Sequence, residues 1–119
     1  MEAYLTIGSD GEKISIEASV PVILKSKDGE YSAYCPLFNT IGFSNSGEEE
    51  SINDLKRALT LFFRVHIKRG TLKNALSYYN WEKNNDSFSL PKSYSISSDL
   101  SDGKIIKMDI TKIEYLEAA

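Results

Sequence analysis

The sequence predicts a single α+β domain, residues 1–119, in which an antiparallel β-sheet packs against one long helix. Before residue 45, short segments alternate apolar and polar residues between turn-forming residues, which is typical of antiparallel strands. Residues 46–70 carry an apolar stripe at three- and four-residue spacing, which is typical of an amphipathic helix. The length of 119 residues suits one domain with a modest core.

Composition and charge limit the classes of function. Hydrophobic residues make up 41% and charged residues 26% of the chain, as in folded globular proteins. Seventeen acidic residues against fourteen basic ones give a formal charge of −3, which argues against nucleic-acid binding through a generally basic surface and leaves a local basic patch open.

The sequence has one cysteine and one histidine, which excludes an intrachain disulfide and a common zinc site. Cys35 has no intrachain disulfide partner, and with His66 it cannot supply a common zinc site. The longest apolar run, Val20 to Leu24, is far too short to span a bilayer. Residues Met1 to Ile7 show no secretory pattern, so we expect a cytoplasmic protein with no membrane partner.

The first strands surround a turn-rich cluster. Tyr4 to Ile7 and Ile14 to Ala18 alternate on either side of Ser9 to Glu12, which predicts either a hairpin or a lead-in followed by a first long strand.

A second hairpin is predicted around Asp28-Gly29, because that dipeptide suits a two-residue turn with both φ angles positive. Pro21 and Pro36 fall opposite one another and predict where the pairing stops, since neither can donate to the ladder. The register, with Lys27 opposite Glu30, predicts these further pairs: Ser26 with Tyr31, Lys25 with Ser32, Leu24 with Ala33, Ile23 with Tyr34 and Val22 with Cys35.

A third strand, Thr40 to Ser44, is predicted after a bend at Leu37 to Asn39, which completes a three-strand meander. We expect this strand to bury Ile41 and Phe43.

The long helix has predicted start and stop signals. Ser46 to Glu49 matches a capping box, in which Ser46 bonds the third helical amide and Glu49 reaches back. Gly70 is a natural stop. The expected apolar stripe consists of Ile52, Leu55, Leu59, Phe62, Phe63 and His66, with Asn53, Lys56, Arg57 and Arg64 facing solvent.

The C-terminal part carries weaker signals. Thr71 is expected to cap a second helix that ends near Asn80, with Trp81 closing the core. Asn84 to Ser93 are predicted as a loop, followed by strands around Tyr94 to Ile96 and Ile106 to Ile110. Residues 111–119 could form a short capped helix or continue the strand.

Several carboxylates could suggest a metal or acid–base site. Asp28 and Glu30 lie close together, but the turn and a pair with Lys27 explain them. Glu48 to Glu50 suit the N-terminus of a helix, where carboxylates favour the helix dipole. The sequence therefore predicts no catalytic residue, no metal site and no cofactor.

Other reactive side chains also have structural interpretations. His66 lies on the apolar stripe, where a hydrogen-bonded, partly buried imidazole is expected, and Cys35 lies on the predicted core face. No Gly-rich phosphate loop, GxSxG or HExxH motif occurs. The aromatic residues Tyr31, Tyr34, Tyr78, Tyr79 and Trp81 favour a core or a protein interface over base stacking.

Residues Val20 to Arg69 resemble the HicB-like antitoxin family, which has a reduced ribonuclease-H-like β-β-β-α unit. Glu50 stands where the family usually has a small alanine after its Thr-x-Glu-Glu pattern. The residues that carry the resemblance are Asp28, Gly29, Tyr31, Ala33, Pro36, Gly42, Ser46, Glu48 and Glu49.

The resemblance implies a protein that binds a HicA-type ribonuclease toxin and blocks its action on messenger RNA. Many family members also bind DNA through a C-terminal domain, but the extension from Asn84 to Ala119 offers strands and at most one short acidic helix, so we expect no operator binding. An alternative is a HicB-fold interaction or regulatory module without a toxin, expected to be homo-oligomeric.

A nuclease is disfavoured, since ribonuclease-H-like catalysis needs convergent carboxylates that begin on the first strand. Val20 to Ser26 contain none.

Overall fold

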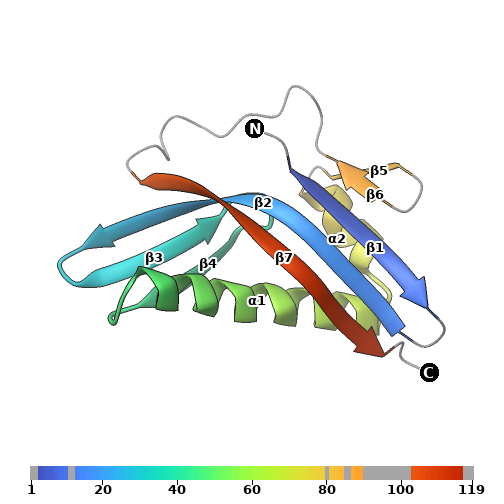
Figure 1. Ribbon diagram of the computed structural model, residues 1–119. Coiled ribbons are helices and arrows are strands. Elements are labelled where there is room, and N and C mark those ends of the chain that lie inside the picture. The colour runs from blue at the N-terminus through green and yellow to red at the C-terminus, as the bar shows by residue number, and fades with distance from the viewer. Residues whose placement is uncertain (1–2, 11–12, 80, 85–86, 90–102, 117–119) are drawn as a thin grey trace.

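The computed structural model describes residues 3–10, 13–79, 81–84, 87–89 and 103–116, and it confirms the α+β class (Figure 1). An antiparallel sheet lies in one layer and the long helix α1 covers one of its faces. The helices are α1 (Glu48–Arg69) and α2 (Leu72–Tyr78). The strands are β1 (Tyr4–Asp10), β2 (Lys13–Lys27), β3 (Glu30–Cys35), β4 (Thr40–Ser44), β5 (Glu82–Asn84), β6 (Ser87–Ser89) and β7 (Lys104–Leu116).

Strand β2 holds the sheet together. β7 pairs with it over most of its length, from Lys13 to Leu24. β1 pairs with residues 13–19 of β2 and β3 with residues 23–27, so these two strands follow one another along the edge opposite β7. Pro21 falls between the β1 and β3 ladders. Two arms of the sheet, β3 with β4 and β1 with β6 and β5, therefore depend on one strand.

The N-terminal segment has features of both predicted alternatives, the hairpin and the first long strand. β1 and β2 form a hairpin with Tyr4 opposite Ser19, and β2 is also the first long strand, because it runs without interruption to Lys27.

The Asp28-Gly29 hairpin is confirmed, with positive φ angles of 54° and 79° at these two residues. The predicted register from Lys27 opposite Glu30 to Ile23 opposite Tyr34 is correct. The ladder stops there, before Pro21 and Pro36, and the next predicted pair, Val22 and Cys35, is buried beyond its end.

The meander is confirmed, but the predicted orientation of β4 is wrong. Ile41 and Phe43 are 42% and 63% exposed, whereas Gly42 faces α1. A Cβ atom at Gly42 would lie 2.3 Å from the Leu55 backbone nitrogen and 2.4 Å from the Ser51 carbonyl oxygen. The helix therefore rests directly on this glycine, and its neighbours in the strand must point to the other face.

The apolar stripe of α1 is confirmed, with Leu55, Leu59 and Phe63 fully buried. The predicted capping box is wrong, because the helix begins at Glu48 with Gly47 as its N-cap, and no side chain caps it. Ser46 lies one residue too early, and its backbone N–H donates to Ser44 Oγ.

The end of α1 and the start of α2 follow the sequence signals with one exception. Gly70 adopts the left-handed conformation that ends α1, as predicted. Thr71 precedes α2 but its side chain does not cap it, since its hydroxyl lies 2.7 Å from His66 Nδ1. Trp81 closes the core as expected: it stacks on Phe38 and donates from Nε1 to the Leu37 carbonyl.

The C-terminal prediction is partly wrong. The segment predicted as a loop from Asn84 contains the end of β5 and the whole of β6, and β6 pairs with β1. The strand alternative holds through Leu116, because β7 continues to that residue. Residues 90–102 and 117–119, which include the expected Tyr94 to Ile96 strand, lie outside the described residues.

We expect Gly42→Ala to destabilise the protein by about 1–3 kcal/mol, because the new methyl group would meet helix backbone that cannot move alone. Gly8→Ala is the matched control in another strand, since its Cβ would meet only the Ser15 hydroxyl. Urea unfolding measures both variants. Equal effects would contradict the close contact between β4 and α1.

Ser46→Ala should change the free energy of unfolding by less than about 0.5 kcal/mol, because Ser46 does not cap the helix. Leu59→Ala should cost about 2–5 kcal/mol, because its side chain is fully buried. Thermal unfolding monitored by circular dichroism compares the two, and a large loss in Ser46→Ala would restore the capping box.

Candidate protein-binding surface

The carboxylates considered in the sequence take structural positions. Asp28 occupies the turn and Glu30 pairs opposite Lys27 in the hairpin. Glu48 to Glu50 form the first turn of α1, and Glu48 accepts an ion pair from Lys104 of β7 at 3.7 Å. Among the described residues, no group of three or more His, Cys, Asp or Glu side chains could hold a metal ion.

His66 and Cys35 lie in the surroundings that the sequence predicted. The His66 ring packs on Phe62 with centroids 4.6 Å apart, and its Nδ1 shares a hydrogen bond with the Thr71 hydroxyl. Cys35 is fully buried, and burial raises the pKa of its thiol to about 12. A thiol with that pKa is a poor nucleophile near neutral pH.

The positions that carry the HicB-like resemblance do not converge on one site. Asp28 and Gly29 make the turn, and Pro36 follows β3. Ala33 and Gly42 are paired across β3 and β4, and both are buried beneath α1. The remaining positions are Tyr31 on the helix-facing side of β3, Ser46 before α1, and Glu48 and Glu49 in its first turn. These residues shape the fold and leave the binding surface to others.

The face of the sheet opposite α1 carries a row of apolar side chains across four strands. The strand registers place Ile105, Ile23, Tyr34 and Ile41 side by side, from β7 through β2 and β3 to β4. Phe43 lies two residues along from Ile41 on the same face. We call these five residues the outer-face patch.

The outer-face patch is exposed toward its rim. Ile23 at its centre is buried, whereas Ile41, Phe43 and Ile105 are 42%, 63% and 41% exposed. Tyr34 is half-buried, and its hydroxyl donates to Asn39 Oδ1 at 3.0 Å. Exposed apolar side chains gathered on one face of a small protein indicate a candidate interaction surface.

The open edge of β4 borders this patch. Within the described residues β4 pairs with β3 on one side only, and Phe43 N–H points to the other side. Asp54 of α1 accepts this N–H at 2.9 Å and also bonds Arg57 Nη2 at 3.3 Å. The hydrogen bond from Phe43 is the main cause that lowers the pKa of Asp54, followed by that from Arg57.

Asp54 thus covers part of an edge that could otherwise pair with another strand. Ladder pairs alternate in direction, so Ile41, two residues from Phe43, also turns its backbone groups to the open side.

The hairpin tip and the start of α1 lie at the same end of the molecule (Figure 1), and charged side chains of both signs belong to these segments. Glu30 shares the outer face with Phe43, since it lies two residues from Ser32, the partner of Phe43. The acidic side chains of this end are Asp28, Glu30, Glu48, Glu49, Glu50 and Asp54. Lys25 and Lys27 share the outer face with Glu30, since Lys27 is the partner of Glu30 and Lys25 the partner of Ser32. Charged groups of both signs therefore border the patch, which suits a partner that is apolar at its centre and charged at its rim.

The sequence missed most of this surface because it placed Ile41 and Phe43 in the core. Gly42 was the available signal: glycine inside a strand indicates close backbone approach, so the residues on either side of it face away from the helix. Ile105 could not be placed from the sequence, because its position depends on the pairing of β7 with β2.

Comparison with models of protein families, with curated proteins and with solved structures finds no significant match to this chain. No described helix is long and apolar enough to cross a membrane.

In Asp54→Asn the free energy of unfolding should fall less steeply as pH is lowered than in the wild-type protein. The low pKa of Asp54 stabilises the fold above about pH 4, where the unfolded chain has already released this proton, and this contribution is lost as pH falls through the folded-state pKa. Thermal unfolding between pH 2 and 7 should therefore show a shallower slope in the variant. Glu49→Gln, which removes another carboxylate of α1, controls for net charge, and equal slopes in the two variants would contradict the role of Asp54.

Proposed function

We propose that this chain is a HicB-like antitoxin, a cytoplasmic protein without enzymatic activity that neutralises a HicA-type ribonuclease toxin by covering its surface. The observation that carries the proposal is the outer-face patch of exposed apolar side chains. The order β2, β3, β4, α1 agrees with the β-β-β-α unit that the sequence resembles, and the motif residues occupy turns and close contacts of that unit.

Apolar burial and electrostatic attraction contribute differently to the proposed binding. Phe43 and Ile41 offer exposed apolar area, whose burial slows dissociation. The carboxylates at the same end attract a basic protein and raise the rate of association, an effect that salt screens. Binding of operator DNA by the C-terminal segment is not part of the proposal, since β7 is committed to the sheet through its pairing with β2.

The alternative is an interaction module of the same fold that has no toxin and uses the outer-face patch for another protein. The two functions differ in one observation, which is whether a small basic protein is encoded beside this chain and forms a complex with it.

Phe43→Ala should weaken binding of that neighbouring basic protein at least about tenfold, because Phe43 is the most exposed apolar residue of the patch. Co-expression and co-purification identify the complex, and surface plasmon resonance measures the affinity. Rescue of growth in cells that express the toxin provides the functional readout. Association should slow as salt concentration rises, while dissociation changes less.

Tyr78→Ala is the matched control, since Tyr78 is an aromatic residue 77% exposed on α2 and outside the patch. Equal affinity losses in Phe43→Ala and Tyr78→Ala would reject the outer-face patch. Failure of the wild-type protein to bind any toxin-like neighbour would reject the antitoxin and favour the alternative module.

A further inference from the structure

The solvent face of α1 has an ordered distribution of charge. Glu50 and Asp54 lie in its first two turns, and Arg57, Arg64 and Lys68 lie farther along. The spacings of three, four and seven residues place these side chains on the side of α1 opposite its buried stripe, with Asp54 at the border where it accepts the Phe43 N–H of β4. The face is therefore acidic at its N-terminal end and basic at its C-terminal end.

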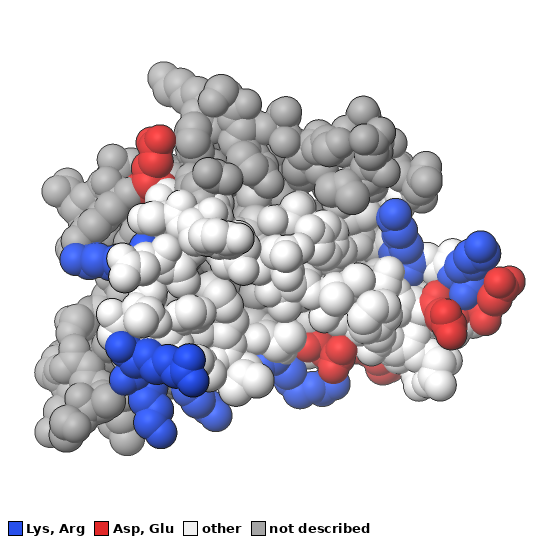
Figure 2. Space-filling model, turned by 180° about the vertical axis from the view of Figure 1, so that it is seen from behind, with Lys and Arg blue, Asp and Glu red and all other residues white. Residues whose placement is uncertain are grey.

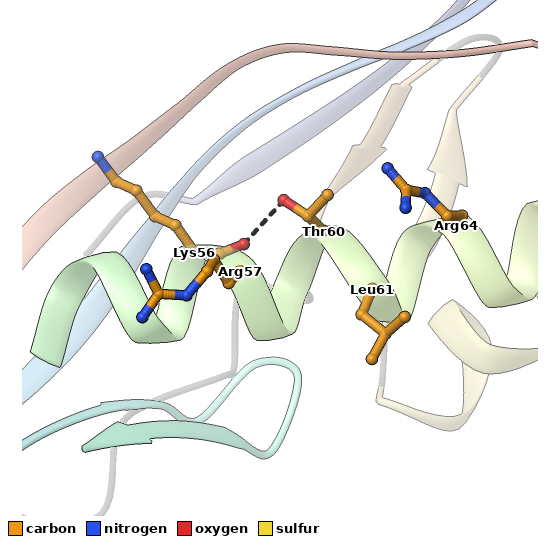
Figure 3. A pocket seen from close by; sticks show the side chains of 5 residues that line it. All are labelled: Lys56, Arg57, Thr60, Leu61 and Arg64. Carbon is orange, nitrogen blue, oxygen red and sulfur yellow. Dashed lines mark hydrogen bonds between the residues drawn. The ribbon is translucent and has the colours of Figure 1, made fainter. Parts of the chain in front are cut away.

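An exposed apolar residue lies between the two charged ends. Leu61 is 59% exposed, although most of its neighbours on this face are charged. Figure 3 shows Leu61 and Arg57 on one flank of the helix, and Lys56, Thr60 and Arg64 along the other. These five side chains line a shallow depression, in which the Thr60 hydroxyl donates to the Lys56 carbonyl at 2.8 Å. The basic end stands out in the view from behind, where Lys and Arg atoms gather most densely toward one end (Figure 2).

The charges of this face are complementary to those of a second copy turned end for end. Glu50 and Lys68 are each nine residues from Leu59, and Asp54 and Arg64 are each five residues from it. An α-helix rises about 1.5 Å per residue, so both members of each pair lie equally far along the axis from Leu59. An antiparallel neighbour centred on Leu59 would place each acidic side chain opposite a basic one.

We propose that α1 pairs with α1 of a second copy in an antiparallel dimer. Its two-fold axis passes the solvent face of each helix at the level of Leu59, whose own side chain points into the core. In this arrangement Leu61 packs against the aliphatic stem of the partner's Arg57, since these positions are each two residues from the centre. A two-fold interface must be complementary to itself, and the pairs Glu50 with Lys68 and Asp54 with Arg64 meet that condition. A parallel arrangement would instead place like charges together.

A second copy explains this face better than a phosphate polymer does. Glu50 and Asp54 on the same face would repel phosphate groups, and Leu61 in the middle offers them no hydrogen bond. A second copy places opposite charges beside one another at both ends and covers the leucine. The contact between two helices is small, so we expect dimerisation to depend on protein concentration in the micromolar range.

The dimer and the antitoxin proposal use different faces of the protein. α1 covers one face of the sheet and the outer-face patch lies on the other (Figure 1). The two proposals share the carboxylates Glu50 and Asp54, so they are separated by variants that each change one surface: Phe43→Ala tests the patch, and Leu61→Arg tests the helix face.

Sedimentation of the full chain tests the interface. The wild-type protein should pass from monomer to dimer with rising concentration. Leu61→Arg should raise the dissociation constant at least tenfold, because it sets a positive charge against the partner's Arg57. Tyr78→Arg, at an exposed position on α2, should leave the dimer unchanged. Circular dichroism checks that both variants fold.

Disulfide trapping tests the antiparallel register. Equal amounts of Glu50→Cys and Lys68→Cys chains should form mixed cross-linked dimers under mild oxidation, whereas each variant alone should cross-link at least tenfold more slowly. Buried Cys35 will not compete, because its thiol is inaccessible and has a raised pKa. Glu50→Cys chains that cross-link alone as fast as the mixture would overturn the proposal.

Two other results would also overturn it: a wild-type protein that stays monomeric at hundreds of micromolar, or a monomer that binds a single-stranded RNA oligonucleotide through Arg64 and Lys68. The second result would assign this face to a polyanion.

Discussion

The fold depends on the place where α1 rests on the sheet without an intervening side chain. Gly42 provides that contact, and its β3 neighbour Ala33 is also small and buried. Backbone packed this closely fixes the height of the helix over β3 and β4, and it also fixes which face of each strand is internal. The exposed positions of Ile41 and Phe43 follow directly, because residues beside an inward-facing glycine must face outward. The exposed apolar patch is thus a geometric consequence of a packing contact on the other side of the sheet.

The same contact places a charged side chain at the sheet edge. With Leu55 and Ser51 against Gly42, the same turn of α1 brings Asp54 to the N–H that Phe43 turns away from β3. The hydrogen bond stabilises the ionised carboxylate and satisfies an edge amide. Across the molecule, Lys104 connects the start of β7 to Glu48 at the start of α1. An exposed ion pair of this length contributes little stability, so the pairing of β7 with β2 holds the C-terminal strand in place.

The sequence predicted the structure correctly where residues close together in the chain determine it. Asp28-Gly29 adopts positive φ angles with little strain, which fixed the turn and therefore the register of a whole hairpin. The stripe of Leu55, Leu59 and Phe63 identified the buried side of α1, because helical periodicity survives any choice of partner.

The sequence-based predictions were wrong or incomplete where two neighbouring residues suit the same role, or where a strand pairs with a segment far away in the chain. Ser46 and Gly47 both suit a helix start, and the extended backbone of Gly47 moved that start one residue along. In β4 the sequence predicts the alternation with the wrong phase, because it assigns Ile41 and Phe43 to the core, whereas Gly42 between them faces the helix. The pairing of β7 with β2 joins residues about 80 to 100 positions apart, and nothing local to either strand specifies it.

The two surfaces of this protein differ in the physical effect that would hold a partner. The outer-face patch is mainly apolar, with charged groups of both signs at one end, so the residence of a partner there would come from buried area. The solvent face of α1 is mainly charged, with a single exposed leucine, so its selectivity comes from the order of charges along the helix. A formal charge of −3 conceals this difference, because acidic and basic side chains occupy opposite ends of one helix. Charge order, rather than net charge, therefore decides which partner each face can accept.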